Sequence, residues 1–128
     1  MCGIAGLIDL NDRPVSPALV KRMTDAIAPR GPDGEGQWTE DNVGIGHRRL
    51  SIIDLSQEAA QPMFSQDQRY VLSYNGEVYN FKELKKELQD SGYAFRSNTD
   101  SEVVLYSLIE WDTDALLKFN GMFALALW

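Results

Sequence analysis

The sequence predicts one domain of mixed α/β architecture, built in layers with largely antiparallel sheets. Segments with strand-like apolar runs and segments with helical periodicity follow one another without the regular strand-helix-strand alternation of a parallel sheet. The chain has 128 residues, which allows one domain at most, and its hydrophobic content of 44% is ordinary for a globular core. We therefore assign all segments to a single domain.

Apolar runs bounded by turn residues predict the strands. They lie at 3–8, around 37–39, at 43–53, at 70–75 and at 122–128. The last run looks like a core strand. Because the partner of such a strand normally follows it, we expect a domain that is truncated at its C-terminus.

Capping residues and apolar spacing predict the helices. A helix starts at Ser16-Pro17, another at Asn80 with Glu83, a third at the capping box of Thr99 and Glu102, and a short one lies near 114–119. Pro29 stops the first helix and Gly92 closes the second, whereas residues 55–69 are polar and irregular.

Charge and cysteine content exclude several kinds of partner. The formal net charge is −7, with Asp and Glu spread along the chain, so we expect neither nucleic acid nor an anionic membrane to bind. The single cysteine cannot form an internal disulfide, which is usual for proteins of the reducing cytosol. The apolar start has no basic leader, and no apolar run is long enough to span a membrane. We expect a cytoplasmic protein without an anchor.

Cys2 directly follows the initiator Met1, which is normally removed when a small residue comes second. Removal would leave a thiol and a free α-amine on one residue. A free α-amine has a pKa of about 7.7 to 8.0 and a thiol about 8.5, so the amine can accept the proton of the thiol near neutrality. The alternative is that Cys2 is only a small hydrophobic residue beside a buried strand.

Other residues have suitable chemistry but also ordinary explanations. Asn75-Gly76 could supply a side-chain amide and a backbone N–H to a developing oxyanion, or form a plain turn with Glu77 solvated beyond it. Arg48 and Arg49 should point to opposite faces of a strand, and the inward one needs a carboxylate, from the protein or from an α-amino acid. Capping explains Asp100 without any ligand.

Two further features have structural explanations. His47 is the only histidine in the chain, so a metal cluster or a catalytic triad would have to depend on it alone. We assign it a structural role and expect no metal. The loop at 30–34 contains Pro-Asp-Gly, which favours a simple turn.

Several short motifs follow one another along the chain. They are Met-Cys-Gly-Ile at the start, RGPDG at 30–34, HRRLSIIDLS at 47–56, AAQPM at 59–63, YNGEVYN at 74–80, TDSEV at 99–103 and FNGMFALALW at 119–128. In this order they resemble the glutaminase domain, a class II glutamine amidotransferase domain, of glutamine-hydrolysing asparagine synthetases. Glucosamine-phosphate and phosphoribosyl amidotransferases use different wording in the third and fourth motifs, and β-lactam synthetase lacks the cysteine.

The resemblance implies an α+β fold of the N-terminal-nucleophile (Ntn) hydrolase type, an αββα sandwich in which helices cover two antiparallel sheets. It implies that Cys2 attacks the side-chain amide of glutamine, releasing ammonia and forming a thioester that water hydrolyses to glutamate. Asn75 and Gly76 match the oxyanion hole of the family.

The same resemblance implies the residues that bind the substrate. Arg49 matches the residue that holds the α-carboxylate of glutamine, and Glu77 and Asp100 match those near its α-ammonium group. The backbone around Ile52 matches a further substrate contact. The choice of Arg49 over Arg48 depends on this match alone.

Whole domains of the family extend beyond Trp128, and the full enzymes add a synthetase domain that binds ATP, magnesium and aspartate for asparagine synthesis. We therefore interpret residues 1–128 as a partial glutamine amidotransferase type 2 domain with no cofactor of its own. Its expected partners are glutamine and the synthetase domain that accepts ammonia, and a homodimer is an open alternative. A retained Met1 would make the site an unprocessed precursor. A non-catalytic glutamine-binding or assembly module is the competing function.

Overall fold

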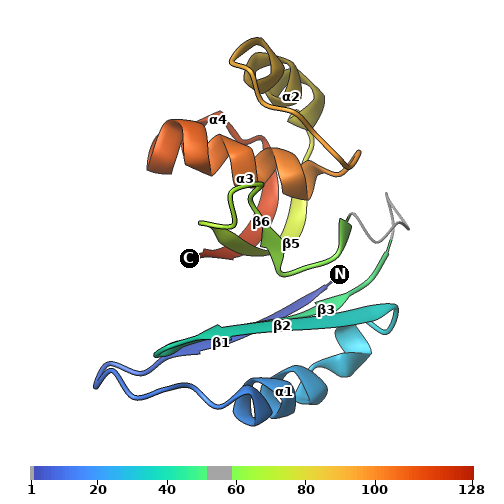
Figure 1. Cartoon of the computed structure of the whole chain (residues 1–128). Helices are drawn as coiled ribbons and strands as arrows, with labels where there is room; N and C mark the ends of the chain where they lie inside the picture. The colour runs from blue at the N-terminus through green and yellow to red at the C-terminus, as the bar shows by residue number, and fades with distance from the viewer. Residues whose placement is uncertain (1, 52–58) are drawn as a thin grey trace.

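The computed structural model describes residues 2–51 and 59–128, and Figure 1 shows how their elements are arranged. The strands are β1 (Gly3–Ile8), β2 (Gly34–Glu40), β3 (Val43–Arg49), β4 (Met63–Phe64), β5 (Val71–Val78) and β6 (Gly121–Leu127). The helices are α1 (Pro17–Ala26), α2 (Phe81–Asp90), α3 (Asp100–Trp111) and α4 (Ala115–Lys118), with short 3-10 turns at Ala28–Arg30 and Asp112–Asp114. Among the described residues, no helix has the length and apolar character needed to cross a membrane.

The strands form two antiparallel sheets that face each other. The first sheet contains β1, β3 and β2 in that spatial order, and the second contains β4, β5 and β6. Helix α1 covers the outer face of the first sheet, whereas α3 covers the outer face of the second and α2 packs against α3 (Figure 1). The predicted layered architecture with antiparallel sheets is therefore confirmed.

Helix α1 lies close to the first sheet because β3 carries glycines on the face beneath it. A Cβ atom at Gly46 would lie 2.3 Å from Cγ2 of Thr24, and one at Gly44 would lie 2.6 Å from Cγ2 of Val20. Helix α1 begins at Pro17, as the sequence predicts. Since side chains alternate along a strand, Ile45 and His47 face the second sheet.

The main hydrophobic core surrounds α3, which lies between the second sheet and α2 (Figure 1). Its buried members are Met63, Leu72, Tyr74, Val78, Leu84, Leu88, Val103, Val104, Leu105 and Tyr106. Residues 100–107 of α3 are buried on every side of the helix, as expected for a helix enclosed by a sheet and a second helix. This packing fixes the N-terminal end of α3 against β5.

Strand β5 is longer than the sequence predicts. The expected strand at 70–75 ends before the glycine, but the observed strand pairs with β6 from Leu72 to Val78 without interruption. The interpretation of Asn75-Gly76 as a turn is therefore wrong, and Glu77 belongs to the strand instead of a turn.

Two other boundaries also differ. The expected strand at 43–53 ends at Arg49 in β3, and residues 52–58 lie outside the part of the chain that the structure describes. Within the segment 55–69, expected to be irregular, Met63–Phe64 forms the short strand β4. Within the part of the chain that the structure describes, this strand pairs only with the beginning of β5.

The capping box at the start of α3 is only half formed. Thr99 Oγ1 accepts a hydrogen bond from the Glu102 N–H at 3.5 Å, as predicted. The Glu102 carboxylate, however, accepts bonds from the N–H groups of Arg96 at 3.0 Å and Ser97 at 2.7 Å. A buried carboxylate thus anchors the loop that precedes the helix.

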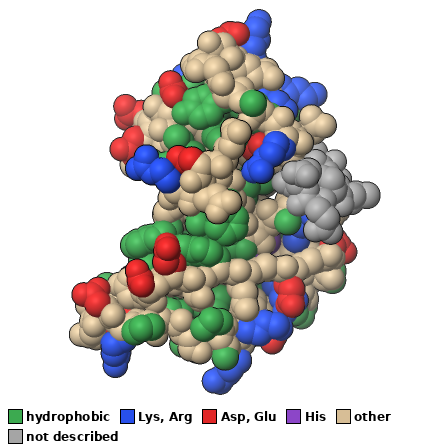
Figure 2. All heavy atoms as spheres, viewed as in Figure 1, with side chains coloured by type: hydrophobic (Ala, Val, Ile, Leu, Met, Phe, Trp, Pro, Cys, Tyr) green, Lys and Arg blue, Asp and Glu red, His purple; other side chains and the backbone are tan. Residues whose placement is uncertain are grey.

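Strand β6 was expected to be a core strand, and this holds for part of it only, because Leu125 and Leu127 pack against the main core while other residues of the strand are exposed. Met122 is 68% exposed and Trp128 is 49% exposed, and β6 forms an edge of the second sheet, where β5 is its only strand partner among the described residues. Figure 2 shows hydrophobic side chains gathered between the two layers, on the side where Figure 1 places β6. The Asn80 side chain does not cap α2; it donates to the Lys118 carbonyl and accepts from the Asn120 N–H before this strand.

A buried histidine links the two sheets. His47 of β3 is fully buried, and its Nδ1 lies 3.0 Å from Oγ of Ser73 on β5. Burial lowers the pKa of His47 from 6.5 to about 4, and the charge of Arg49 contributes. Among the described residues, no group of three His, Cys, Asp or Glu side chains is arranged to hold a metal ion. The expectation that the chain binds no metal stays a prediction.

The stability of the fold should fall in acid because of His47. The pKa in the folded chain, about 4, is below the ordinary value of 6.5, so between these values only the unfolded chain takes up a proton there. This contribution to stability is complete above pH 6.5 and is lost as the pH falls to 4, with a total on the order of 3 kcal/mol. Urea denaturation at several pH values would measure it.

The matched control is His47→Asn, which places an amide near the position of Nδ1 but cannot take up a proton. We expect the free energy of unfolding of this variant to vary less with pH over the same range. Equal pH dependence in both proteins would contradict the assignment to His47.

Candidate active site

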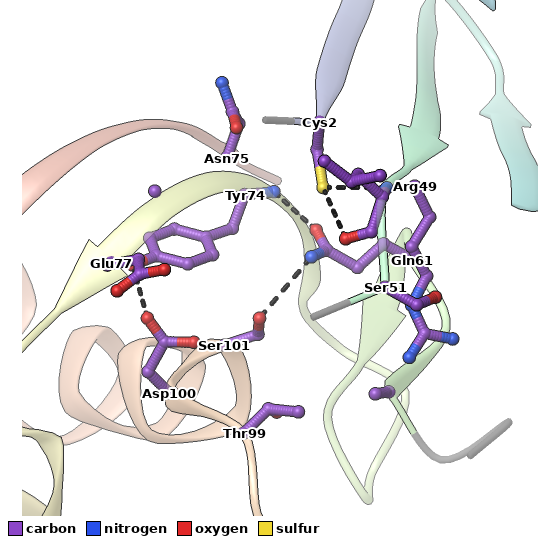
Figure 3. A pocket seen from close by; sticks show the side chains of 13 residues that line it. Cys2, Arg49, Ser51, Gln61, Tyr74, Asn75, Glu77, Thr99, Asp100 and Ser101 are labelled. Atoms are coloured by element: carbon purple, nitrogen blue, oxygen red, sulfur yellow. Dashed lines mark hydrogen bonds between the residues drawn. The ribbon is translucent and has the colours of Figure 1, made fainter. Parts of the chain in front are cut away.

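A pocket lies between the two sheets, and the N-terminal end of α3 forms part of its wall (Figure 3). Six residues predicted from the sequence line it: Cys2, Arg49, Asn75, Gly76, Glu77 and Asp100. They come from both sheets and from α3, so the fold brings together residues that are far apart in the sequence. Ile52, the seventh predicted residue, lies outside the described part of the chain.

The Cys2 sulfur lies beside the main chain that follows β3. Sγ accepts a hydrogen bond from the Leu50 N–H at 3.3 Å and lies 3.7 Å from the Leu50 carbonyl oxygen. Arg30 Nε donates to the Cys2 carbonyl at 3.2 Å. The cysteine is half-buried and forms no disulfide. Cys2 is therefore fixed through its backbone and its sulfur while it lines the pocket.

The two neighbouring arginines of β3 point in opposite directions, as strand alternation predicts. Arg48 points toward α1, where its guanidinium forms an ion pair with Asp25 and donates to the Thr24 carbonyl at 3.1 Å, and it forms a second ion pair with Glu35 of β2. Arg49 lines the pocket instead. The salt-bridge explanation thus applies to Arg48, and Arg49 brings a positive charge to the site.

Asp100 is buried at the start of α3 and is bound to β5. Its Oδ2 accepts hydrogen bonds from the Tyr74 hydroxyl at 2.8 Å and from the Val78 N–H at 3.0 Å. Burial raises the pKa of Tyr74 far above its ordinary value, and the neighbouring Asp100 adds to this effect, so Tyr74 stays a hydrogen-bond donor. Both bonds use Oδ2, and the same side chain also lines the pocket. Capping alone does not explain this residue.

Gly76 brings the backbone of β5 close to that of β6. A Cβ atom at this position would lie 2.4 Å from the Met122 carbonyl oxygen and 2.5 Å from Cα of Phe123. The N–H groups of a strand alternate in direction, and the Val71 N–H bonds to Trp128 on the β6 side. The N–H of Gly76 therefore points the other way, toward the edge that borders the pocket.

Some residues that support the site were not predicted. The loop at 30–34 is more than a turn, because Arg30 holds the Cys2 carbonyl and Asp33 Oδ2 accepts from the Ser51 N–H at 2.8 Å. Gln61 also lines the pocket, with its side chain bonded to strand β5 and to α3 (Figure 3). The only signals in the sequence were the RGPDG and AAQPM motifs that contain these residues.

Comparisons with known proteins identify the family. A family model described as a glutamine amidotransferase domain matches residues 1–128. Glutamine-hydrolysing asparagine synthetase 3 of Bacillus subtilis (strain 168) is 41% identical over 131 residues, which cover 100% of this chain and 21% of that protein. Glutamine-hydrolysing asparagine synthetase B of Escherichia coli (strain K12) is 37% identical over 131 residues, covering 100% of this chain and 23% of that protein.

The chain belongs to the glutamine amidotransferase domain family. It spans about a fifth of the length of these relatives. Among solved structures, glutamine phosphoribosylpyrophosphate amidotransferase from B. subtilis matches with a TM-score of 0.80 and 19% sequence identity, covering 100% of this chain and 35% of that one. At this identity the likeness shows the fold alone. The expected Ntn hydrolase sandwich of two antiparallel sheets is confirmed.

Removing the hydroxyl of Tyr74 should destabilise the domain. In Tyr74→Phe the buried Asp100 carboxylate loses one of its donors, which should lower the free energy of unfolding by about 1 to 3 kcal/mol. Tyr93→Phe is the control, because the Tyr93 hydroxyl donates to the exposed Glu110 and its loss should change stability by about 0.5 kcal/mol at most. Urea denaturation of both variants makes the comparison, and equal losses would contradict it.

Proposed function

We propose that this chain hydrolyses glutamine to glutamate and ammonia, with Cys2 as the nucleophile after Met1 is removed. The observation that best supports this function is the meeting of Cys2, Arg49, Gly76 and Asp100 around one pocket. A thiol, a fixed cation, a backbone donor and a carboxylate are what an enzyme needs to hold an α-amino acid and attack its side-chain amide.

The proposed reaction begins with the thiol and the amine of Cys2. The amine takes the proton from Sγ as the sulfur attacks the side-chain carbonyl carbon of glutamine. The oxygen of that carbonyl becomes negatively charged and receives hydrogen bonds from the Asn75 side chain and the Gly76 N–H. Breakage of the C–N bond then yields a thioester, and the leaving group takes up the proton and departs as ammonia. Water attacks the thioester and releases glutamate.

The charged residues of the pocket orient the substrate in this proposal. Arg49 binds the α-carboxylate, for which the planar guanidinium allows two parallel hydrogen bonds. Glu77 of β5 and Asp100 of α3 attract the α-ammonium group. Such positioning matters because the attacking and attacked atoms must be close and correctly aligned.

For the full-length protein we propose that the ammonia passes to a synthetase domain that makes asparagine from aspartate. The support is the naming of the relatives, which are asparagine synthetases. ATP and magnesium belong to that domain, since the hydrolysis steps require only a thiol, an amine and water. We also propose a cytoplasmic location, because a reducing compartment keeps the thiol of Cys2 free.

The intact mass of the purified protein tests the proposed nucleophile. We expect a mass without Met1 that increases by one adduct after exposure to a diazoketone analogue of glutamine. Cys2→Ala should form no adduct and should release ammonia from glutamine at least about a thousand times more slowly than the unsubstituted protein.

Two results would contradict this function. A retained Met1 would leave the nitrogen of Cys2 acylated and unable to act as a base. A trimmed protein that binds glutamine but forms no adduct would support the non-catalytic binding module instead.

A further inference from the structure

Gln61 occupies a position in the second sheet where a backbone partner would normally lie. In the antiparallel register Met63 of β4 is opposite Leu72 of β5, so Gln61 is opposite Tyr74. The strand pairing stops at Met63, but the Gln61 side chain continues it: Oε1 accepts a hydrogen bond from the Tyr74 N–H at 2.5 Å. A side-chain carboxamide thus accepts the hydrogen bond that the backbone of a neighbouring strand would otherwise accept.

The bond to Tyr74 belongs to a row of donors along one edge of β5. The N–H groups of Leu72, Tyr74, Gly76 and Val78 all point to this edge. Leu72 is paired with β4, Tyr74 with Gln61, and Val78 with Asp100. The Gly76 N–H therefore lies between two donors that side chains hold in place.

The same carboxamide also contacts α3. Its Nε2 donates to Ser101 Oγ at 3.5 Å, and Ser101 follows Asp100 at the start of the helix (Figure 3). Gln61 therefore connects β5 to the N-terminal end of α3, where Asp100 binds the Val78 N–H of the same edge. A movement of the backbone at Asn75 and Gly76 would strain the bond from Tyr74 to Gln61 or the bond from Val78 to Asp100.

We propose that Gln61 is a positioning residue that fixes the direction of the Asn75-Gly76 donors toward the carbonyl oxygen of the substrate. This inference rests on the proposed glutamine hydrolysis. Gln61 contacts no reacting atom and acts through Tyr74. Since the donors matter most when the oxygen is negatively charged, a loosened strand should slow the reaction more than it weakens substrate binding.

The test compares Gln61→Met with Gln61→Glu in the protein whose Met1 has been removed. Methionine has a similar length but no strong acceptor for the Tyr74 N–H, whereas glutamate keeps an acceptor oxygen. We expect Gln61→Met to lower kcat by about 10- to 100-fold with KM changed by about twofold at most, a part of the effect of deleting one oxyanion donor. Gln61→Glu keeps the acceptor for the Tyr74 N–H but adds a negative charge beside the pocket. Its kcat should therefore lie between that of Gln61→Met and that of the unsubstituted protein, at least about threefold above the former.

Binding of two ligands separates positioning from general damage. An aldehyde analogue of glutamine forms a tetrahedral adduct with a thiol and so depends on the oxyanion donors, whereas the product glutamate does not. In Gln61→Met the affinity for the aldehyde should fall by the same factor as kcat/KM, while the affinity for glutamate stays unchanged. If Gln61→Met does not fold, Gln61→Asn serves instead, because its shorter side chain cannot reach Tyr74.

The outcomes distinguish this inference from the function on which it rests. If the unsubstituted protein does not hydrolyse glutamine, the proposed function fails and the inference fails with it. If that protein is active and Gln61→Met retains its kcat and its affinity for the aldehyde, only the inference is overturned. Equal losses of aldehyde and glutamate binding would also overturn it, because they indicate a structural role.

Discussion

The pairing of β5 on its two edges controls the geometry of the site. One edge pairs with β6 along most of its length, whereas β4 covers only the first part of the other edge. Beyond β4, unpaired N–H groups would be costly to bury, so each needs a partner or a ligand. Gln61 and Asp100 supply partners at Tyr74 and Val78. The remaining donor of this edge, at Gly76, borders the pocket.

Buried polar contacts connect the same strand to the rest of the fold. His47 reaches β5 from the first sheet through Ser73, and Asp100 reaches it from α3. These hydrogen bonds are of ordinary length and are buried away from water, which makes their loss costly. Stability and the alignment of the pocket therefore depend on overlapping sets of residues, and substitutions near the site require stability measurements alongside kinetic ones.

The sequence predicts the regular elements well where the local signals are strong. The apolar run at 3–8 and the Ser-Pro start of α1 correspond closely to the observed strand and helix. The prediction fails at β5, because Asn75-Gly76 has the composition of a turn. The glycine is needed there for the close approach of β6, a contact between distant segments that local patterns do not reveal.

In the site, too, local motifs predict some residues and miss those that depend on contacts between distant segments. The motifs indicate Cys2, Arg49 and Asp100 through their resemblance to a known domain, and all three line the pocket. The supporting contacts of Arg30 and Gln61 were not predicted, because they depend on which backbone groups the fold leaves without a strand partner. Which backbone groups lack a strand partner is decided by the pairing of the strands in three dimensions.

A crystal structure of the protein with Cys2 alkylated by the diazoketone analogue of glutamine would show where the substrate atoms lie. Our account predicts that the ketone oxygen lies about 3 Å from both the Asn75 side-chain amide and the Gly76 N–H, with the α-carboxylate on Arg49. A ketone oxygen directed away from β5, or an α-carboxylate that does not contact Arg49, would contradict the account.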